Sequence, residues 1–509
     1  MPTTLIFGTH PVRESLKRQY GQEGIEVLTE DRFALPSGAL PDELVILTSG
    51  VPEQDDAQAL AFLEELAGAY KAAGERPHRP LVHLLLQKAA SLRMLQLSDF
   101  PPEVNDAFEV FPFTMEEAWA ERMVVRLPGI DQNNTSSGLD RTPIGADSRQ
   151  FVHLVIIGFD SYAESMAVKA AQVAHFPNYD GKNPQPLRTR ISIIQPGIGP
   201  ARDKFLARFR TLFDNSFYRT VDIAGKASSL HHPQYEGKRE DFIDIEWEFV
   251  DGEWSHPTVM EKLAFWAQDP RRQLTMVISG QEDIANAECA MALPEAVSAR
   301  EIPVWVRLRH DTLSASLRQS PRFRHLRVFG MDTEGYNVRL PLMRLARLLH
   351  YFYRCSYGAT GIPTAFPQEE VEAAWQEAGA LKMRLSNVCN VMSMSTKMHS
   401  LGHDDQDLKT FYALTAEEVT LLARTEHNRW CVERLLSGTR VCTDEERAAI
   451  GRDISLKKEY KKNRDAHYDL CAFDELQADE KGTDVRVYDY DLTACIPLMM
   501  ESFMKEESR

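Results

Sequence analysis

The sequence lacks several features that would place it quickly in a class. No apolar run is long enough to span a bilayer. The first residues, MPTTLIFGTH, have neither the basic start nor the long apolar core of a signal peptide. The seven cysteines include no CxxC pair, so neither a zinc ribbon nor a dithiol redox site is indicated. We therefore expect a cytoplasmic protein with reduced thiols, no bound metal and no membrane span.

Basic charge and catalytic motifs are also scarce. Lys and Arg number 58 against 75 Asp and Glu, which gives a net charge of −17. This balance argues against a general affinity for DNA or RNA, so a nucleotide ligand would need a local basic pocket. The sequence contains no GxSxG, Walker loop, HExxH or kinase signature. No class of enzyme is indicated, and a ligand sensor is favoured over an enzyme.

The length of 509 residues predicts roughly three or four domains. Over residues 1–125 and again over 151–332, short apolar strands alternate with helices, which is typical of a parallel sheet covered on both faces. Residues 126–150 are rich in Gly, Pro, Asn and Ser and are expected to form a linker. The fold class is therefore α/β: two Rossmann-like, doubly wound domains, followed by a helical connector (335–410) and a helical domain (411–505).

Two turns were considered as nucleotide sites. Gly8 follows the first strand, and Glu30 stands about 20 residues later, where an acid can hold a ribose hydroxyl. Gly158 occupies the same place in the second half, but Asp160 replaces the next glycine and would repel a pyrophosphate. Arg202 follows a glycine-containing turn and could meet a phosphate, although an ordinary turn also explains it. We favour scaffolding or dimerisation for both halves, within a homo-oligomer, and keep a cofactor site as the alternative.

The most informative stretch runs from Leu414 to Gly438. Thr415 and Glu418 predict a helix that begins with a capping box, and Gly438 predicts its end. Glu426 falls in the middle of the apolar face, where an unpaired carboxylate is costly. A buried acid near arginines, a histidine and an indole is either an internal ion pair or the floor of a ligand pocket.

The same residues resemble a known family. Glu426-His427-x-Arg429-Trp430, followed by Gly438, His467-x-x-Leu470 and Phe473-Asp474-x-Leu476, resembles the ryanodine-receptor repeat (RyR) domain over about residues 414–504. The two strand–turn–helix halves resemble the TrkA-N nucleotide-binding domain of potassium-transport regulators. Together these resemblances imply a bacterial sensor whose RyR domain binds a small anionic ligand, such as a nucleotide-derived messenger, in stress or anti-phage signalling.

The resemblance also implies roles for individual residues. Trp430 would stack on a base, while Arg429, Arg434 and the lysine-rich run at 457–464 would meet phosphates. Such a lysine run is otherwise simply solvated surface. Glu426 would orient the arginines, and Asn387 and Lys397 could face the same pocket, although a surface charge is the simpler interpretation of Lys397. The expected ligand-binding residues are Glu426, His427, Arg429, Trp430, Arg434, Lys461, His467 and Asn387.

Two other functions stay open at this point. The first is an NAD(P)-dependent enzyme or transport regulator that uses a Rossmann site at Gly8 and Glu30 or at Gly158. The second is a structural assembly module in which the sheet domains form dimer surfaces and no ligand binds.

Overall fold

The computed structural model describes residues 3–36, 41, 43–74, 78–130, 138–310, 323, 325–357, 361–379, 381–403 and 412–507. Here the chain is mixed α/β, with parallel-strand sheets flanked by helices and a helical C-terminal region. None of the described helices combines the length and apolar character needed to cross a membrane. Residues 131–137 of the predicted linker lie outside the described residues.

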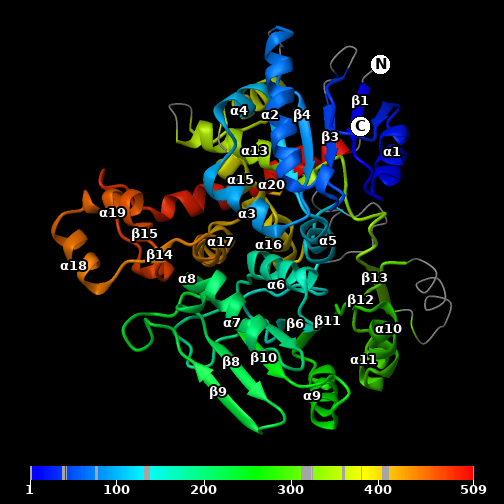
Figure 1. Ribbon diagram of the computed structural model, residues 1–509. Coiled ribbons are helices and arrows are strands. Elements are labelled where there is room, and N and C mark those ends of the chain that lie inside the picture. Colours follow the sequence, from blue (N-terminus) through cyan, green and yellow to red (C-terminus); the bar gives the residue numbers. More distant parts are fainter. Residues whose placement is uncertain are drawn as a thin grey trace. The chain divides into compact units, whose positions relative to one another are not determined.

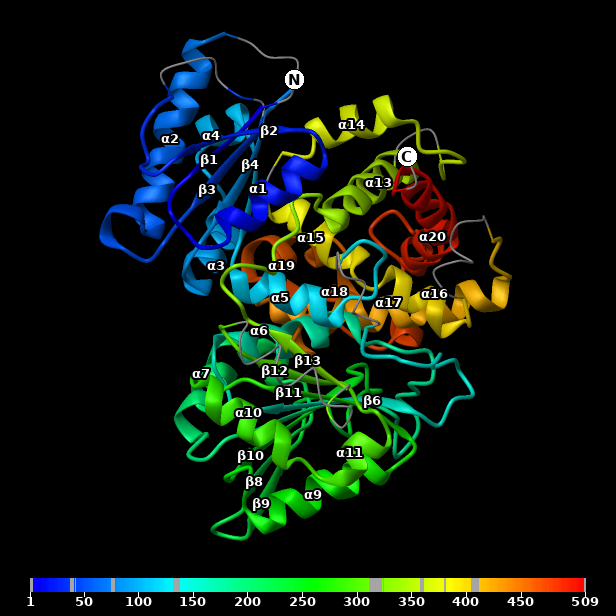
Figure 2. The same ribbon diagram turned by 90° about the vertical axis from the view of Figure 1, so that its right-hand side faces the viewer.

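The chain forms two compact units, which Figures 1 and 2 show from two sides. The first unit comprises Met1–Met123, Pro128–Thr135 and Phe329–Val391. The second comprises Val124–Leu127, Ser136–Val328 and Met392–Arg509. The helical segment after residue 335, expected to be one connector, is thus shared between the two units.

The first unit contains a five-stranded sheet in the order β2-β1-β3-β4-β5, with every neighbouring pair parallel. Its strands are short apolar runs such as TTLIF and ELVIL, whose side chains are buried on both faces, as expected of a parallel sheet. Its elements are β1 (Thr3–Phe7), α1 (Arg13–Gln22), β2 (Glu26–Glu30), β3 (Glu43–Leu47), α2 (Asp56–Ala72), β4 (Leu81–Leu85), α3 (Ala89–Ser98), α4 (Pro102–Ala107), β5 (Glu109–Phe113) and α5 (Met115–Val124).

Helices cover both faces of this first sheet. On one face α2, α3 and α4 share a hydrophobic core with the strands, in which Phe62 packs edge-on against Phe7. On the other face α1 is held by the hydroxyl of Tyr20, which donates to Glu43 at the start of β3. Three later helices, α13 (Pro341–Ser356), α14 (Gln368–Gln376) and α15 (Leu381–Val391), belong to the same unit.

The second unit contains an eight-stranded sheet in the order β13-β12-β11-β6-β7-β10-β8-β9. The pairings of β6, β7, β8, β10, β11 and β12 are parallel, whereas β9 runs antiparallel to β8. Its elements are β6 (Phe151–Ile157), α6 (Ser161–Val173), β7 (Thr189–Ile194), α7 (Gly199–Arg208), α8 (Arg210–Phe213), β8 (Tyr218–Asp222), β9 (Ala227–His231), β10 (Ile245–Asp251), α9 (Pro257–Gln268), β11 (Arg272–Ile278), α10 (Asp283–Ala292), α11 (Glu295–Ala299), β12 (Val304–Arg307) and β13 (Leu326–Phe329).

Two helical layers enclose this second sheet. The layer of α9, α10 and α11 shares one hydrophobic core with alternate strand residues such as Val155 and Val250. On the opposite face, Phe205 of α7 and Phe213 of α8 pack against Trp247 of β10. Figure 2 shows α6 on one side of the sheet and α9 and α11 on the other.

The C-terminal part of the second unit is built around α17, as the sequence predicts. Thr415 and Glu418 form the capping box at the start of this helix, and α20 packs along it. Helix α17 also contacts α6 and α8 of the sheet region. The elements are α16 (Met394–Ser400), α17 (Ala416–Leu436), β14 (Arg440–Val441), α18 (Asp444–Arg452), α19 (Leu456–Arg464), β15 (Ala466–His467) and α20 (Arg486–Glu507).

Some local features of the structure have no clear signal in the sequence. Within the helical connector predicted at 335–410, the helix that ends at Val391 is followed by a separate helix, α16, and neither Gly nor Pro marks this break. Strand β9, which ends at His231, has mostly exposed residues and lacks the apolar alternation of a half-buried strand. Strand β5 was not predicted because it contains Pro112, a residue tolerated at the edge of a sheet.

Candidate functional site

Glu426 on α17 is a buried ion-pair centre. Its side chain is 2% exposed, and both carboxylate oxygens accept hydrogen bonds from the guanidinium of Arg429, at 2.9 and 2.8 Å. The Nζ atom of Lys397 lies 2.8 Å from Glu426 Oε2. Lys397 is itself fully buried, so the surface-charge interpretation of this lysine is wrong. The carboxylate is therefore matched by two cations from α16 and α17.

A second acid completes this ion-pair network. Glu433, one turn after Arg429, accepts a hydrogen bond from Arg429 Nη1 at 2.8 Å and another from Arg434 at 3.0 Å. Burial by itself would raise the pKa of Glu426, but Arg429 and Lys397 outweigh it and hold that pKa at about 2. Arg429 is wholly buried and donates hydrogen bonds to both Glu426 and Glu433. The network is thus an internal brace of α17.

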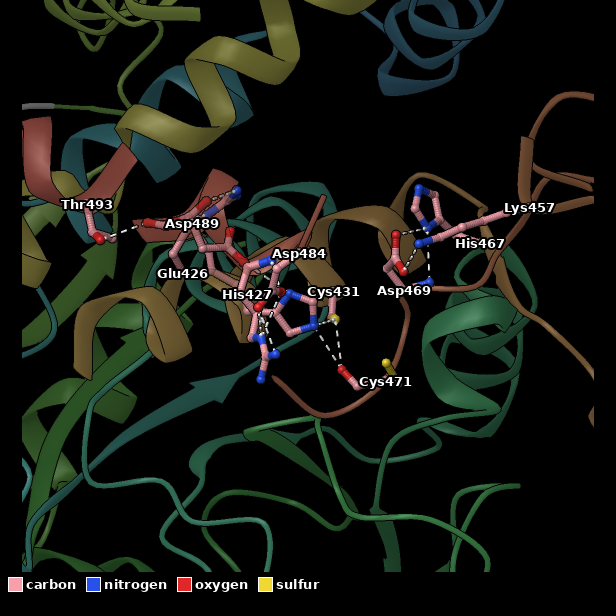
Figure 3. Close-up of polar contacts among 12 residues, drawn as sticks. Glu426, His427, Cys431, Lys457, His467, Asp469, Cys471, Asp484, Asp489 and Thr493 are labelled. Carbon is pink, nitrogen blue, oxygen red and sulfur yellow. Dashed lines mark hydrogen bonds and ion pairs between the residues drawn. The ribbon is translucent and has the colours of Figure 1, made fainter. Parts of the chain in front are cut away.

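His427 lies in a second buried polar cluster. Its Nε2 is 2.9 Å from the carbonyl oxygen of Cys471 and 3.5 Å from the Cys431 thiol, while Nδ1 is 3.5 Å from Asp489 of α20. Figure 3 shows the imidazole between these groups. Burial raises the pKa of Asp489. Burial alone would lower the pKa of His427, but Cys431 and Asp489 outweigh it and raise that pKa. This contact between His427 and Asp489 links α17 to α20.

Trp430 stands at the boundary between these clusters and a basic face. Its indole is half-buried and is stacked near the ring of His427, at 5.6 Å between centroids. The ring of His467 meets it edge-on at 4.9 Å, and the guanidinium of Arg434 lies 5.9 Å from its centroid. An aromatic face with cations around it can hold a planar, negatively charged group by stacking and charge.

Positive charge accumulates on this face. Lys457 of α19 is paired with Asp469 at 2.7 Å, as Figure 3 shows. Asp469 attracts the ammonium of Lys461, but partial desolvation of this ammonium together with Arg434 outweighs that attraction and lowers the pKa of Lys461. Burial, reinforced by Lys461 and Arg434, lowers the pKa of His467 to about 2. His467 is therefore neutral at physiological pH, and the carboxylate of Asp469 lies 3.8 Å from its Nδ1. We call Trp430, Arg434, Lys461 and His467 the basic face.

The structure places seven of the eight predicted ligand residues in two groups and Asn387 apart from both. Glu426, His427 and Arg429 lie in the buried clusters, whereas Trp430, Arg434, Lys461 and His467 form the basic face. Asn387 belongs to α15 in the first unit, where its side-chain amide lies 3.2 Å from Nδ1 of His350. A direct role of Asn387 in the same pocket stays a prediction.

At the carboxyl ends of β1 and β3 in the first sheet, other residues of the chain occupy the position where a nucleotide would bind. Gly8 has a φ of +96°, and a Cβ there would lie 2.1 Å from the carbonyl oxygen of Leu47, so the glycine is required by close packing. Gln54 accepts hydrogen bonds from the hydroxyls of Thr9 and Ser49 and donates to the backbone of Asp31. The side chain of Glu30 is exposed. These contacts favour a structural turn at Gly8.

The turn after β6 is closed in a similar way. Strand order reverses between β6 and β11, the point where open α/β sheets bind ligands. Here Asp160 caps α6 through the amide of Ala163, accepts a hydrogen bond from Ser279 at 2.7 Å, and forms an ion pair with Arg307 of β12. Gly158 fits against the carbonyl of Ser279. The acid at this turn is thus fully engaged.

Arg202 and its turn also have protein partners. The guanidinium pairs with the neighbouring Asp203 at 2.8 Å. The amide of Gly197 donates to the carboxylate of Asp251 at 2.7 Å, so an acid already occupies part of the position expected for a phosphate. Phosphate binding by Arg202 stays a prediction. No group of His, Cys, Asp and Glu able to hold a metal ion occurs within the described part of the chain.

No protein-family model matches this chain, and a search of the curated proteins finds no match. The resemblance to the RyR and TrkA-N domains therefore rests on the residues quoted above.

Several members of the clusters were not predicted from the sequence. Glu433 could have been found, because it stands four residues after Arg429 on the same helix, the spacing of a helical ion pair. Asp489 and Asp469 give no such signal, because they are far from His427 and Lys457 in the sequence.

Proposed function

We propose that this chain is a cytoplasmic ligand sensor of bacterial origin whose RyR-like C-terminal region binds a small anionic ligand with an aromatic group. A nucleotide or nucleotide-derived messenger, used in stress or anti-phage signalling, fits this description. The two sheet regions are proposed to be Rossmann-like, TrkA-N-related scaffolds within a homo-oligomer.

The observation that carries the proposal is the basic face. Lys461 and Arg434 stand beside a half-buried indole and a histidine that burial and these cations keep neutral. In a protein with a net charge of −17, such an accumulation of cations is local and is not a property of the whole surface. Stacking on Trp430 would select an aromatic base, and the cations would bind its phosphates.

The buried clusters support a signalling role. Glu426 accepts hydrogen bonds from Arg429, and Arg429 is linked through Glu433 to Arg434 on the basic face. At the end of the same helix, the hydroxyl of Thr211 in the α8 region donates to the carbonyl of Leu435 at 2.5 Å. A ligand that moves Arg434 would therefore act on a rigid helix that packs against the sheet region.

The rival function, an enzyme that uses NAD(P) at a Rossmann turn, has less support. Gln54 fills the carboxyl end of the first sheet, and Asp160 with Arg307 fills the turn of the second. A dinucleotide would have to displace these contacts before its pyrophosphate could approach the backbone.

The test is binding of a nucleotide panel to the full chain, measured by calorimetry and by thermal unfolding. We expect at least one nucleotide to raise the Tm of the wild type. This rise should be lost in Trp430→Ala, because stacking on a base is worth about 1–3 kcal/mol. In Lys461→Gln the affinity for the nucleotide should fall at least tenfold, because a cation that binds phosphate is removed. Lys481→Gln, at an exposed position outside the lysine-rich run, is the matched control and should bind normally. If binding survives Trp430→Ala but is lost in Asp160→Ala or Gly158→Val, the Rossmann alternative is correct.

A further inference from the structure

Arg384 on α15 is a buried cation that makes no side-chain hydrogen bond within the part of the chain that the structure describes. The residue is 1% exposed. None of its three side-chain nitrogens has a hydrogen-bond partner among the described residues. Burial lowers the pKa of Arg384, but a guanidinium stays charged in proteins because its ordinary pKa is above 12. A charge buried in this way is costly unless an anion or several acceptors accompany it.

The acids near Arg384 are already engaged elsewhere in the first unit. The charged groups acting on it are Glu109, Arg79, Asp99 and Arg347. Glu109 accepts hydrogen bonds from Arg347, at 3.1 Å to each oxygen, and from the Trp375 indole at 2.7 Å.

Asp99 is engaged by backbone groups. Its carboxylate caps α15 by accepting the amide of Leu381 at 3.2 Å, and it also accepts the amide of Phe100 at 2.8 Å. Both acids therefore attract the charge of Arg384 but accept their hydrogen bonds from other groups.

The other cations near Arg384 increase the local positive potential. Arg79 donates its hydrogen bonds to neutral oxygens, the side chain and carbonyl of Gln376 and the carbonyl of Asn105. Arg347 shares Glu109 with Trp375 and pairs with the half-buried Glu372 at 2.7 Å. Arg79, just before β4, and Arg347 of α13 thus both act on Arg384 of α15. Of these three arginines, only Arg384 makes no side-chain hydrogen bond to a described residue.

We propose that Arg384, with Arg79 and Arg347 beside it, binds a small oxyanion, a phosphate or a carboxylate, within the first unit. The planar fork of a guanidinium donates two parallel hydrogen bonds to such a group. This site involves none of the residues of the basic face and does not depend on the proposed nucleotide ligand. It would make the stability of the first unit respond to the oxyanion concentration.

The test is thermal unfolding of the full chain in an amine–chloride buffer, titrated with inorganic phosphate and, in a second arm, with acetate. Sodium chloride at equal ionic strength is the blank. We expect one of the two anions to raise the Tm by roughly 5–10 °C at about one hundred times its Kd. The responding arm identifies a phosphate or a carboxylate as the ligand class.

The variant Arg384→Met gives the sharper result because its effect should change sign. Without oxyanion it removes an unmatched buried charge, so its Tm should equal or exceed that of the wild type. With oxyanion the wild type should be the more stable. Arg384→Lys should fold and keep the charge but bind more weakly, because it loses the fork. Lys382→Met, at an exposed position of the same helix, should behave as the wild type.

Three results would overturn this inference. One is a wild-type Tm that neither anion raises, a measurement that needs no variant. Another is an Arg384→Met protein that is destabilised equally in both buffers, which would mean a purely structural arginine. The third is a rise in Tm that persists in Arg384→Met and disappears in Lys461→Gln, because the anion would then bind at the basic face.

Discussion

Replacement of Glu426 by Gln tests the buried brace most directly. The substitution keeps the size of the side chain and removes its charge, which leaves Lys397 and Arg429 buried beside a neutral amide. The pKa of Glu426 falls from 4.5 to about 2, and each tenfold change in proton affinity corresponds to about 1.4 kcal/mol. Ionised Glu426 thus contributes about 3 kcal/mol to folding, in the range of about 3–5 kcal/mol for breaking a buried ion pair.

The contribution should depend on pH in a defined direction. Because the folded pKa is the lower one, the stabilisation is complete above the unfolded pKa of about 4.5 and is lost as the pH falls towards 2. The assay is urea unfolding followed by tryptophan fluorescence between pH 7 and pH 3, for the wild type and Glu426→Gln. The difference in unfolding free energy should be about 3 kcal/mol at pH 7 and should shrink below about pH 4.5.

A matched control comes from the same helix. Glu417 lies in the exposed first turn of α17, and Glu417→Gln should change the free energy of unfolding by less than about 1 kcal/mol. The reasoning is refuted if Glu426→Gln costs no more than this control. It is also refuted if the cost of Glu426→Gln stays constant down to pH 3, since the carboxylate would then not be the origin of the stabilisation.

Three further predictions concern other parts of the chain. Gly158→Ala should destabilise the second unit by more than about 1 kcal/mol, because the φ of Gly158 is +93° and a Cβ there would lie 2.3 Å from the carbonyl oxygen of Ser279. As the control in the same urea assay, Gly451→Ala should be neutral or stabilising, because Gly451 lies in a helix with open space around it. The imidazole NMR signal of His467 should not titrate between pH 5 and pH 8, because its pKa is about 2, and a midpoint near 6.5 would contradict the basic face. Nucleotide affinity should fall as salt rises from 50 to 500 mM if Lys461 meets a phosphate, whereas a salt-independent Kd would leave stacking on Trp430 as the only contribution.

The amino-acid sequence predicts the local elements well. Apolar runs such as FVHLVII and the box of Thr415 and Glu418 specify strands and helix ends through interactions within a few residues. The alternation of strands and helices likewise predicts parallel sheets. The sequence also predicts that Glu426 lies on the apolar face of α17, because the helical repeat determines the direction in which each side chain points.

Only the tertiary structure decides how these charges are matched. Lys397, Asp489 and Asp469 stand far along the chain from the groups they neutralise, so no spacing rule identifies them. The same limit explains why Arg384 gives no sequence signal: its lack of partners results from helix packing and from acids that other residues have already engaged. The sequence determines which side chains are buried in a helix or strand, whereas the assembly of distant elements determines which buried charges find a partner.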